Sequence, residues 1–143
     1  MTPNQRPKIL VPFDFSEPAQ RALTWAVEYA GQRRSELHLL HVVEYHLADL
    51  FADNIPADDE RLKGVAGKAQ RKLEDVRVEK STVYRHVAIG RPVHEILAVA
   101  AKLRPALIVI GSHGRTGLPG LLIGSVAEHV IRHARCPVVC VKH

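Results

Sequence analysis

Apolar positions along this sequence follow two patterns that alternate from one end of the chain to the other. Five short runs are predicted as strands, and they cover residues 8–11, 37–43, 82–88, 106–110 and 137–141. Four of them are apolar, whereas residues 82–88 alternate less cleanly. In the four segments between them, apolar residues recur at every third or fourth position, as on the buried face of a helix. This alternation predicts a parallel sheet covered by helices on both faces.

Serine, proline and glycine residues mark the expected ends of the helices. Ser16 can cap the first helix with Pro18 in its first turn, and Gly31 is expected to end it. Pro105 prevents the third helix from running on. Periodicity also assigns inward faces to the last two helices, namely Val93, Ile96, Leu97 and Ala100 in the third and Val126, Ala127, Val130 and Ile131 in the fourth.

The five strands and four helices are expected to form one doubly wound α/β domain over residues 1–143, with strand order 3-2-1-4-5. The third strand includes Arg85 and His86 and is therefore expected at a partly solvated edge. Because the winding direction reverses between strands 1 and 4, the loops after Val11 and Ile110 should face each other across a crevice. This topology places Asp14 opposite residues 111–125.

Composition and charge narrow the functional classes. Hydrophobic residues make up 46% of the chain and charged residues 24%, as in ordinary globular proteins. The sequence contains neither an apolar run of about 18 residues nor a signal-peptide core, so no membrane association and a cytoplasmic location are expected. The net charge of +5 favours small anions, while scattered basic residues and only 5% aromatics make nucleic-acid binding an unfavoured interpretation.

Residues 111–125 join the fourth strand to the fourth helix and contain five glycines. Glycine lets backbone N–H groups approach an anion closely, and a helix N-terminus adds donors with a favourable dipole. The segment therefore predicts phosphate binding, with a sharply turning structural loop as the alternative. Its spacing is neither that of a P-loop, because no Gly-Lys-Ser/Thr follows, nor that of a Rossmann dinucleotide site.

The glycine spacing instead resembles the Gly-x2-Gly-x9-Gly-Ser/Thr signature of ATP-binding universal stress proteins. Two residues separate Gly111 from Gly114, nine separate Gly114 from Gly124, and Ser125 completes the pattern. The similarity covers essentially the whole chain, including residues 9–16, 40–43 and 136–139. It implies an adenine nucleotide alpha hydrolase-like α/β fold and an ATP-binding function.

The resemblance also implies roles for particular residues in binding ATP, or alternatively ADP or AMP, with Mg²⁺ accompanying the phosphates. The residues expected beside adenine and ribose are Pro12, Asp14 and Val42. Those expected at the ribose and the phosphates are Gly111, Gly114, Gly124, Ser125 and Val126. Its position in the loop makes Arg115 the nearest cation to a bound phosphate, with a solvated loop-tip residue as the equal alternative. The chemistry suits these roles, because a carboxylate can accept hydrogen bonds from ribose hydroxyls and an aliphatic wall suits adenine.

The expected function is a nucleotide-dependent regulatory or stress-response module, and the alternative is a slow ATP-hydrolysing enzyme. Against the enzyme, residues 12–16 differ from a Ser-Gly-Gly pyrophosphatase loop, and no carboxylate pair or Ser/His/Asp set is placed to activate water. Related proteins pair their last strand across a two-fold axis. A homodimer through residues 137–142 is therefore expected, since this apolar strand would otherwise leave an exposed sheet edge.

Three other features are weaker candidates. His129 and His133 lie one helical turn apart, but no third ligand is evident, so an exposed helix face is favoured over a metal site. Cys136 and Cys140 are interpreted as free, packed thiols rather than a redox pair. Residues 44–57 carry more apolar surface than an ordinary loop, and they either form a lid or partner contact or pack on their own domain.

Overall fold

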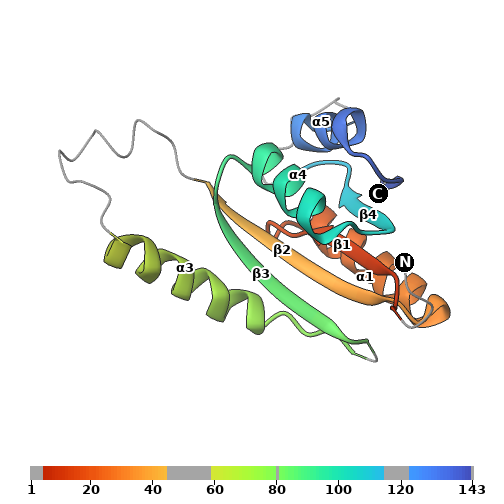
Figure 1. The fold of residues 1–143 in the computed structure, drawn as a ribbon, viewed down its shortest axis with the longest axis horizontal. Coiled ribbons are helices and arrows are strands. Elements are labelled where there is room, and N and C mark those ends of the chain that lie inside the picture. The colour runs from red at the N-terminus through yellow and green to blue at the C-terminus, as the bar shows by residue number, and fades with distance from the viewer. Residues whose placement is uncertain (1–4, 45–58, 80, 115–122, 143) are drawn as a thin grey trace.

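The structure is a computed structural model that describes residues 5–44, 59–79, 81–114 and 123–142. Its strands and helices alternate along the chain, as predicted (Figure 1). The elements are β1 (Lys8–Pro12), α1 (Glu17–Arg33), β2 (Glu36–Glu44), α3 (Asp59–Glu74), β3 (Val83–Gly90), α4 (Pro92–Leu103), β4 (Leu107–Gly111), α5 (Ser125–His133) and β5 (Val138–Val141). None of these described helices is long and apolar enough to cross a membrane.

All five strands join one sheet in the order β3-β2-β1-β4-β5, and every neighbouring pair is parallel. The predicted strand order is confirmed, and β3 lies at an edge as expected. β1 is central, with Ile9 opposite Leu37 of β2 on one side and Leu107 of β4 on the other. Because the chain moves outward in opposite directions from β1, the loops after β1 and β4 leave a crevice at the carboxyl edge.

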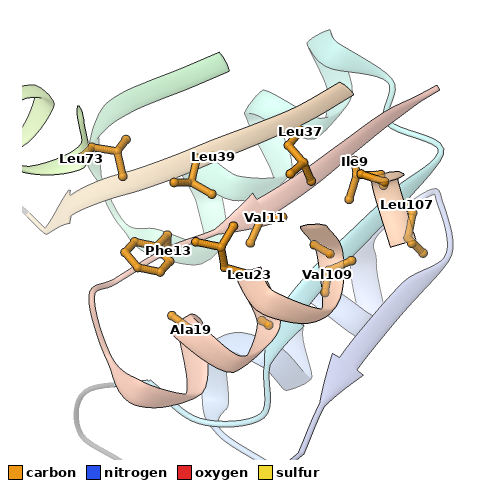
Figure 2. Close-up of a cluster of buried hydrophobic side chains, with 13 residues drawn as sticks. Ile9, Val11, Phe13, Ala19, Leu23, Leu37, Leu39, Leu73, Leu107 and Val109 are labelled. Carbon is orange, nitrogen blue, oxygen red and sulfur yellow. The ribbon is translucent and has the colours of Figure 1, made fainter. Parts of the chain in front are cut away.

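Apolar side chains cover both faces of the sheet, because successive residues of a strand point to opposite sides. Ile9 of β1 points to the face covered by α1 and α3, where Leu23 and Leu73 are buried in the same cluster (Figure 2). Leu10 belongs to a second cluster with α4 and α5, in which Ile96 is buried. Each fully buried leucine contributes about 1.5–3 kcal/mol, so these two clusters hold the carboxyl edge of the sheet in a defined geometry.

Helix α1 begins where the sequence predicts and ends later. Ser16 is its N-cap residue, and the side chain accepts a hydrogen bond from the first turn. The prediction that Gly31 ends the helix is wrong, because α1 continues to Arg33 and is closed by Arg34, whose φ of 51° is left-handed. Glycine inside a helix costs only about 1 kcal/mol relative to alanine, which the surrounding packing offsets.

The predicted inward faces of α4 and α5 are partly wrong. The stripe of α4 that packs in the second cluster consists of Ile96, Val99, Ala100 and Leu103. The predicted Val93 and Leu97 are not part of this cluster. The helix is apolar around most of its circumference, so periodicity does not select one stripe. On α5, Ala127 and Val130 are buried, whereas Ile131 is 43% exposed, because consecutive helical residues point about 100° apart.

Candidate functional site

A cavity of about 580 Å³ opens at the carboxyl edge of the sheet, in the crevice between the loops after β1 and β4. Its walls come from the ends of β1, β2 and β4 and from the starts of α4 and α5. The predicted site residues that line it are Pro12, Asp14, Val42, Gly111, Gly114, Gly124, Ser125 and Val126. Arg115, the remaining predicted site residue, lies outside the described residues, as does most of the predicted lid.

The loop between β1 and α1 holds Asp14 against this cavity. One carboxylate oxygen, Oδ1, accepts hydrogen bonds from the Ser16 backbone N–H at 3.0 Å and from the Ser16 hydroxyl. The Ser16 hydroxyl oxygen in turn accepts from the N–H of Ala19 at 3.2 Å and caps α1. The other oxygen, Oδ2, faces Gly114, where an added β-carbon would lie 3.0 Å away. The Asp14 carboxylate therefore lies between the two loops that form the cavity, opposite the glycine segment as predicted.

Two glycines of the predicted phosphate site make close backbone contacts. A β-carbon on Gly111 would lie 2.7 Å from both the carbonyl carbon and the carbonyl oxygen of Pro18. A β-carbon on Gly124 would lie 3.2 Å from the Ser112 carbonyl oxygen and 3.3 Å from the Cα of His113. The Gly124 N–H also donates to the Ser112 carbonyl at 2.5 Å. Tight packing thus explains part of the glycine pattern, and the same packing forms the cavity wall.

Helix α5 begins at the cavity. Gly124 is its N-cap residue, and its carbonyl accepts the first helical hydrogen bond from the Glu128 N–H at 3.0 Å. The N–H groups of the first helical turn have no carbonyl acceptor within their own helix. Ser125, Val126 and Ala127, which carry these groups, all line the cavity. Together with the partial positive charge of about 0.5 at a helix N-terminus, they form a suitable site for a phosphate group.

Several lining residues were not predicted from the sequence, and these include Leu40, His41, Glu44, Pro92, Ile96 and Ile110. The predicted strand order was a signal for some of them, since it places the carboxyl end of β2 beside that of β1. His41 Nδ1 lies 2.8 Å from the Phe13 carbonyl oxygen. Because a carbonyl only accepts, Nδ1 carries the proton and donates it, which ties β2 to the loop that holds Asp14.

The charge of the cavity comes from its backbone rather than from basic side chains. Among its described lining residues, Asp14 and Glu44 are acidic, His41 and His113 are imidazoles, and none is lysine or arginine. The α5 N-terminus is therefore the positive element of this part of the site. The apolar part is formed by aliphatic side chains that include Leu40, Val42 and Ile110.

Two of the weaker candidates, the histidine pair of α5 and the two cysteines, lie within the described residues. His129 and His133 are exposed on α5 with ring centroids 6.3 Å apart, and His129 Nδ1–H donates to the Ser125 carbonyl at 2.7 Å. Within the described ranges, no group of three His, Cys, Asp or Glu side chains could hold a metal ion. Cys136 and Cys140 are free and partly buried, and burial raises the pKa of both thiols, which keeps them protonated.

Comparison with known proteins tests the resemblance. The model of the universal stress protein family matches residues 5–142. This chain belongs to the universal stress protein family. Universal stress protein MJ0577 of Methanocaldococcus jannaschii is 33% identical to it, over 94% of each protein. Universal stress protein YxiE of Bacillus subtilis is 34% identical, over 94% of this chain and 98% of the relative.

Solved structures of universal stress proteins share the fold. The structure of MJ0577 superposes with a TM-score of 0.81, at 32% identity and 96% coverage of both chains. A universal stress protein from Archaeoglobus fulgidus in complex with dAMP superposes with a TM-score of 0.64, at 25% identity. That alignment covers 96% of this chain and 98% of the Archaeoglobus chain. The doubly wound α/β fold expected from the sequence is thus the fold of the family.

Proposed function

We propose that this universal stress protein binds ATP in the cavity at the carboxyl edge of its sheet and acts as a nucleotide-dependent regulatory or stress-response module. The observation that carries the proposal is that one cavity combines the α5 N-terminus, the Asp14 carboxylate and an aliphatic wall. These three features are complementary to phosphates, ribose hydroxyls and adenine, respectively. The complex of a relative with dAMP supports an adenine nucleotide as the ligand class.

In this proposal each part of the nucleotide has a protein partner. Adenine lies against Pro12 and Val42, and the ribose hydroxyls donate hydrogen bonds to Asp14. Gly111 and Gly114 leave space beside the ribose and the inner phosphates. The first turn of α5 donates to the outer phosphates, which Mg²⁺ accompanies. The described residues suit an ATP molecule, because the N–H donors at the start of α5 and the carboxylate acceptor of Asp14 lie on opposite sides of the same crevice.

The direct test is mass analysis of the nucleotide released when the purified protein is denatured, combined with calorimetric titration of MgATP. We expect Asp14→Asn to weaken ATP binding about tenfold, since a charge-assisted hydrogen bond to ribose is replaced by a neutral one. Glu17→Gln is the matched control, because Glu17 is an exposed carboxylate in an ion pair with Arg21 and does not line the cavity. Release of no adenine nucleotide together with no heat of ATP binding would contradict the proposal.

We also propose a homodimer through residues 137–142. β5 is at the sheet edge and pairs with β4 on one side. The carbonyls of Pro137 and Val141 accept hydrogen bonds from the N–H groups of β4 and of the residue directly after it. The alternate residues Val138 and Cys140 therefore direct their backbone groups away from β4. This outer row of donors and acceptors supports strand pairing with a second copy. The cytoplasmic location expected from the sequence stays a prediction.

The dimer is tested at Cys140. Cys140→Pro removes an outward N–H while leaving the hydrogen bonds to β4, and proline is tolerated at such edge positions. Cys140→Ser is the control that changes the thiol and keeps the N–H. Light scattering at micromolar concentration should give a dimer for the wild type and for Cys140→Ser, and a folded monomer for Cys140→Pro. A monomeric wild type, or a dimer that survives the proline, would refute pairing through β5.

A further inference from the structure

Phe15 has an unusual backbone conformation directly beside the cavity. Its φ of 64° lies in the left-handed region, which bulky residues rarely occupy. Phe15 itself does not line the cavity, but it follows Asp14, which does, and it precedes Ser16, which binds Asp14 and caps α1. A conformation of this kind persists only where surrounding contacts hold it in place.

Among the described residues, two aromatic rings and one ammonium group make specific contacts with the Phe15 ring, which also packs against the first core cluster. The rings of Phe13 and His41 approach its ring edge-to-face, with centroids 5.1 and 4.8 Å away. The ammonium of Lys72, from the last turns of α3, lies 4.3 Å from the ring centroid. Phe13 and His41 are also joined to each other through the Phe13 carbonyl and His41 Nδ1. The ring is therefore held by β2, by α3 and by the loop after β1, to which Phe13 belongs.

Lys72 differs from the other two contacts because it comes from outside the site. Phe13 and His41 line the cavity, whereas Lys72 lies on an exposed position of α3 and does not. An ammonium over an aromatic face is attracted to the negative face of the ring. This contact therefore stabilises the ring position that accompanies the left-handed backbone, and through that backbone the position of Asp14.

We propose that Lys72 is a positioning residue for the nucleotide site, because its ammonium holds the Phe15 ring and thereby the loop conformation that presents Asp14 to the ligand. This inference rests on the proposed ATP binding. It makes ATP affinity depend on the placement of α3, although no atom of Lys72 lines the cavity. Because binding selects the competent loop conformation, apparent affinity falls in proportion to the fraction of molecules that adopt it.

The test combines two charge reversals on the same helix. Lys72→Glu replaces the ammonium over the ring with a carboxylate, which the ring face repels. Lys68→Glu makes the same change in net charge one helical turn earlier, at another exposed lysine. Lys72→Arg keeps a cation that can stack on the ring. By calorimetric titration we expect Lys72→Glu to weaken MgATP binding about two- to fivefold more than Lys68→Glu, and Lys72→Arg to retain the wild-type affinity.

Testing Lys72→Glu and Lys68→Glu in a Phe15→Gly background distinguishes an effect through the Phe15 ring from a general effect of charge on ATP binding. Glycine adopts a positive φ without steric cost, so the loop no longer needs the ring contact. In this background Lys72→Glu and Lys68→Glu should weaken ATP binding equally. An excess loss for Lys72→Glu that persists without the Phe15 ring would overturn the proposal, as would equal effects of the two reversals in the wild-type background.

A measurement without nucleotide keeps the inference separate from the proposed function. The Ser16 N–H donates to Asp14 in the loop that Phe15 completes, so its hydrogen exchange reports the loop conformation. In the ligand-free protein we expect faster exchange of this amide in Lys72→Glu and unchanged exchange in Lys68→Glu. If the wild type bound no ATP, the proposed function would fail, while unchanged exchange in Lys72→Glu would show that Lys72 does not position the loop.

Discussion

Replacement of Gly124 by aspartate tests whether the N-terminus of α5 binds the phosphates of ATP. Gly124 is the N-cap residue, with φ of −78° and ψ of 162°, a conformation that aspartate adopts readily at this position. Its carboxylate is expected to accept hydrogen bonds from the N–H groups of Val126 and Ala127, two residues that line the cavity. Gly124→Asp would therefore occupy the donors that the proposal assigns to the phosphates.

The magnitude follows from the hydrogen bonds that the nucleotide would lose. Two charge-assisted bonds at about 1.5–2 kcal/mol each give about 3–4 kcal/mol, or a loss of affinity of about 10²- to 10³-fold, before charge repulsion is added. Folding should change little. A capping carboxylate at a helix N-terminus contributes about 0.3–1 kcal/mol, which offsets the displacement of Ser112, whose carbonyl oxygen would lie 3.2 Å from the new β-carbon.

Calorimetric titration with MgATP and thermal melting should be carried out on three variants. Gly124→Asp should lose ATP binding by the stated amount while its melting temperature stays within about 4 °C of the wild type. Gly124→Ala carries the same β-carbon without an acceptor and should lose less than about fivefold. Gly124→Asn, a neutral acceptor, should lie between them. An unchanged affinity in Gly124→Asp would remove the phosphate role from α5, and an equal loss in Gly124→Ala would assign the effect to displacement of the loop.

Three further predictions concern stability. Burial lowers the pKa of His38 and His86 below the ordinary 6.5, so the stability that these neutral histidines contribute is present above that pH and is lost as the pH falls. Urea unfolding at about pH 7.5 and about pH 5.5 should show a smaller decline for the double variant His38→Gln/His86→Gln than for the wild type, and an equal decline would contradict this prediction. Arg85→Met should lower the free energy of unfolding by about 1.5–3 kcal/mol, as measured by denaturant titration. Its guanidinium donates a hydrogen bond of 3.1 Å to a backbone carbonyl in the last turn of α3 and one of 2.8 Å to a carbonyl just after that helix. Gly111→Ala should lower the free energy of unfolding by about 1–3 kcal/mol, because the added β-carbon would lie 2.7 Å from the Pro18 carbonyl. A melting temperature equal to that of the wild type would contradict this prediction.

The sequence predicted the location of the candidate site because the order of strands and helices along the chain brings its loops to one edge of the sheet. A parallel doubly wound sheet brings the carboxyl ends of its strands together, so a reversal between β1 and β4 is sufficient to place Asp14 opposite the glycine segment. Glycine spacing and family resemblance then indicated which residues on these loops face the ligand. His41 escaped this reasoning because its contribution depends on a hydrogen bond to Phe13, a residue 28 positions away in the sequence.

Part of the glycine pattern has a cause that local sequence does not contain. Gly111 is adjacent to the Pro18 backbone, and Gly124 to the backbone around Ser112, so the requirement for a missing β-carbon comes from another segment of the chain. The conformation of Phe15 also depends on a distant segment, because its left-handed backbone is stabilised by Lys72, 57 positions later in the sequence. The local propensities of single residues would therefore predict the backbone requirement at none of these three positions.

The sequence by itself determined the alternation of strands and helices, the strand order and the edge of the sheet at which the cavity lies, because hydrophobic periodicity and the handedness of parallel connections constrain them strongly. The tertiary structure decided where α1 ends, which stripe of α4 faces inward and why Ile131 of α5 is exposed. These features depend on the balance of packing against neighbouring elements, where alternatives differ by about 1 kcal/mol and several apolar faces compete. Only the assembled sheet places Lys72, Phe15 and Asp14 in one chain of contacts that ends at the cavity.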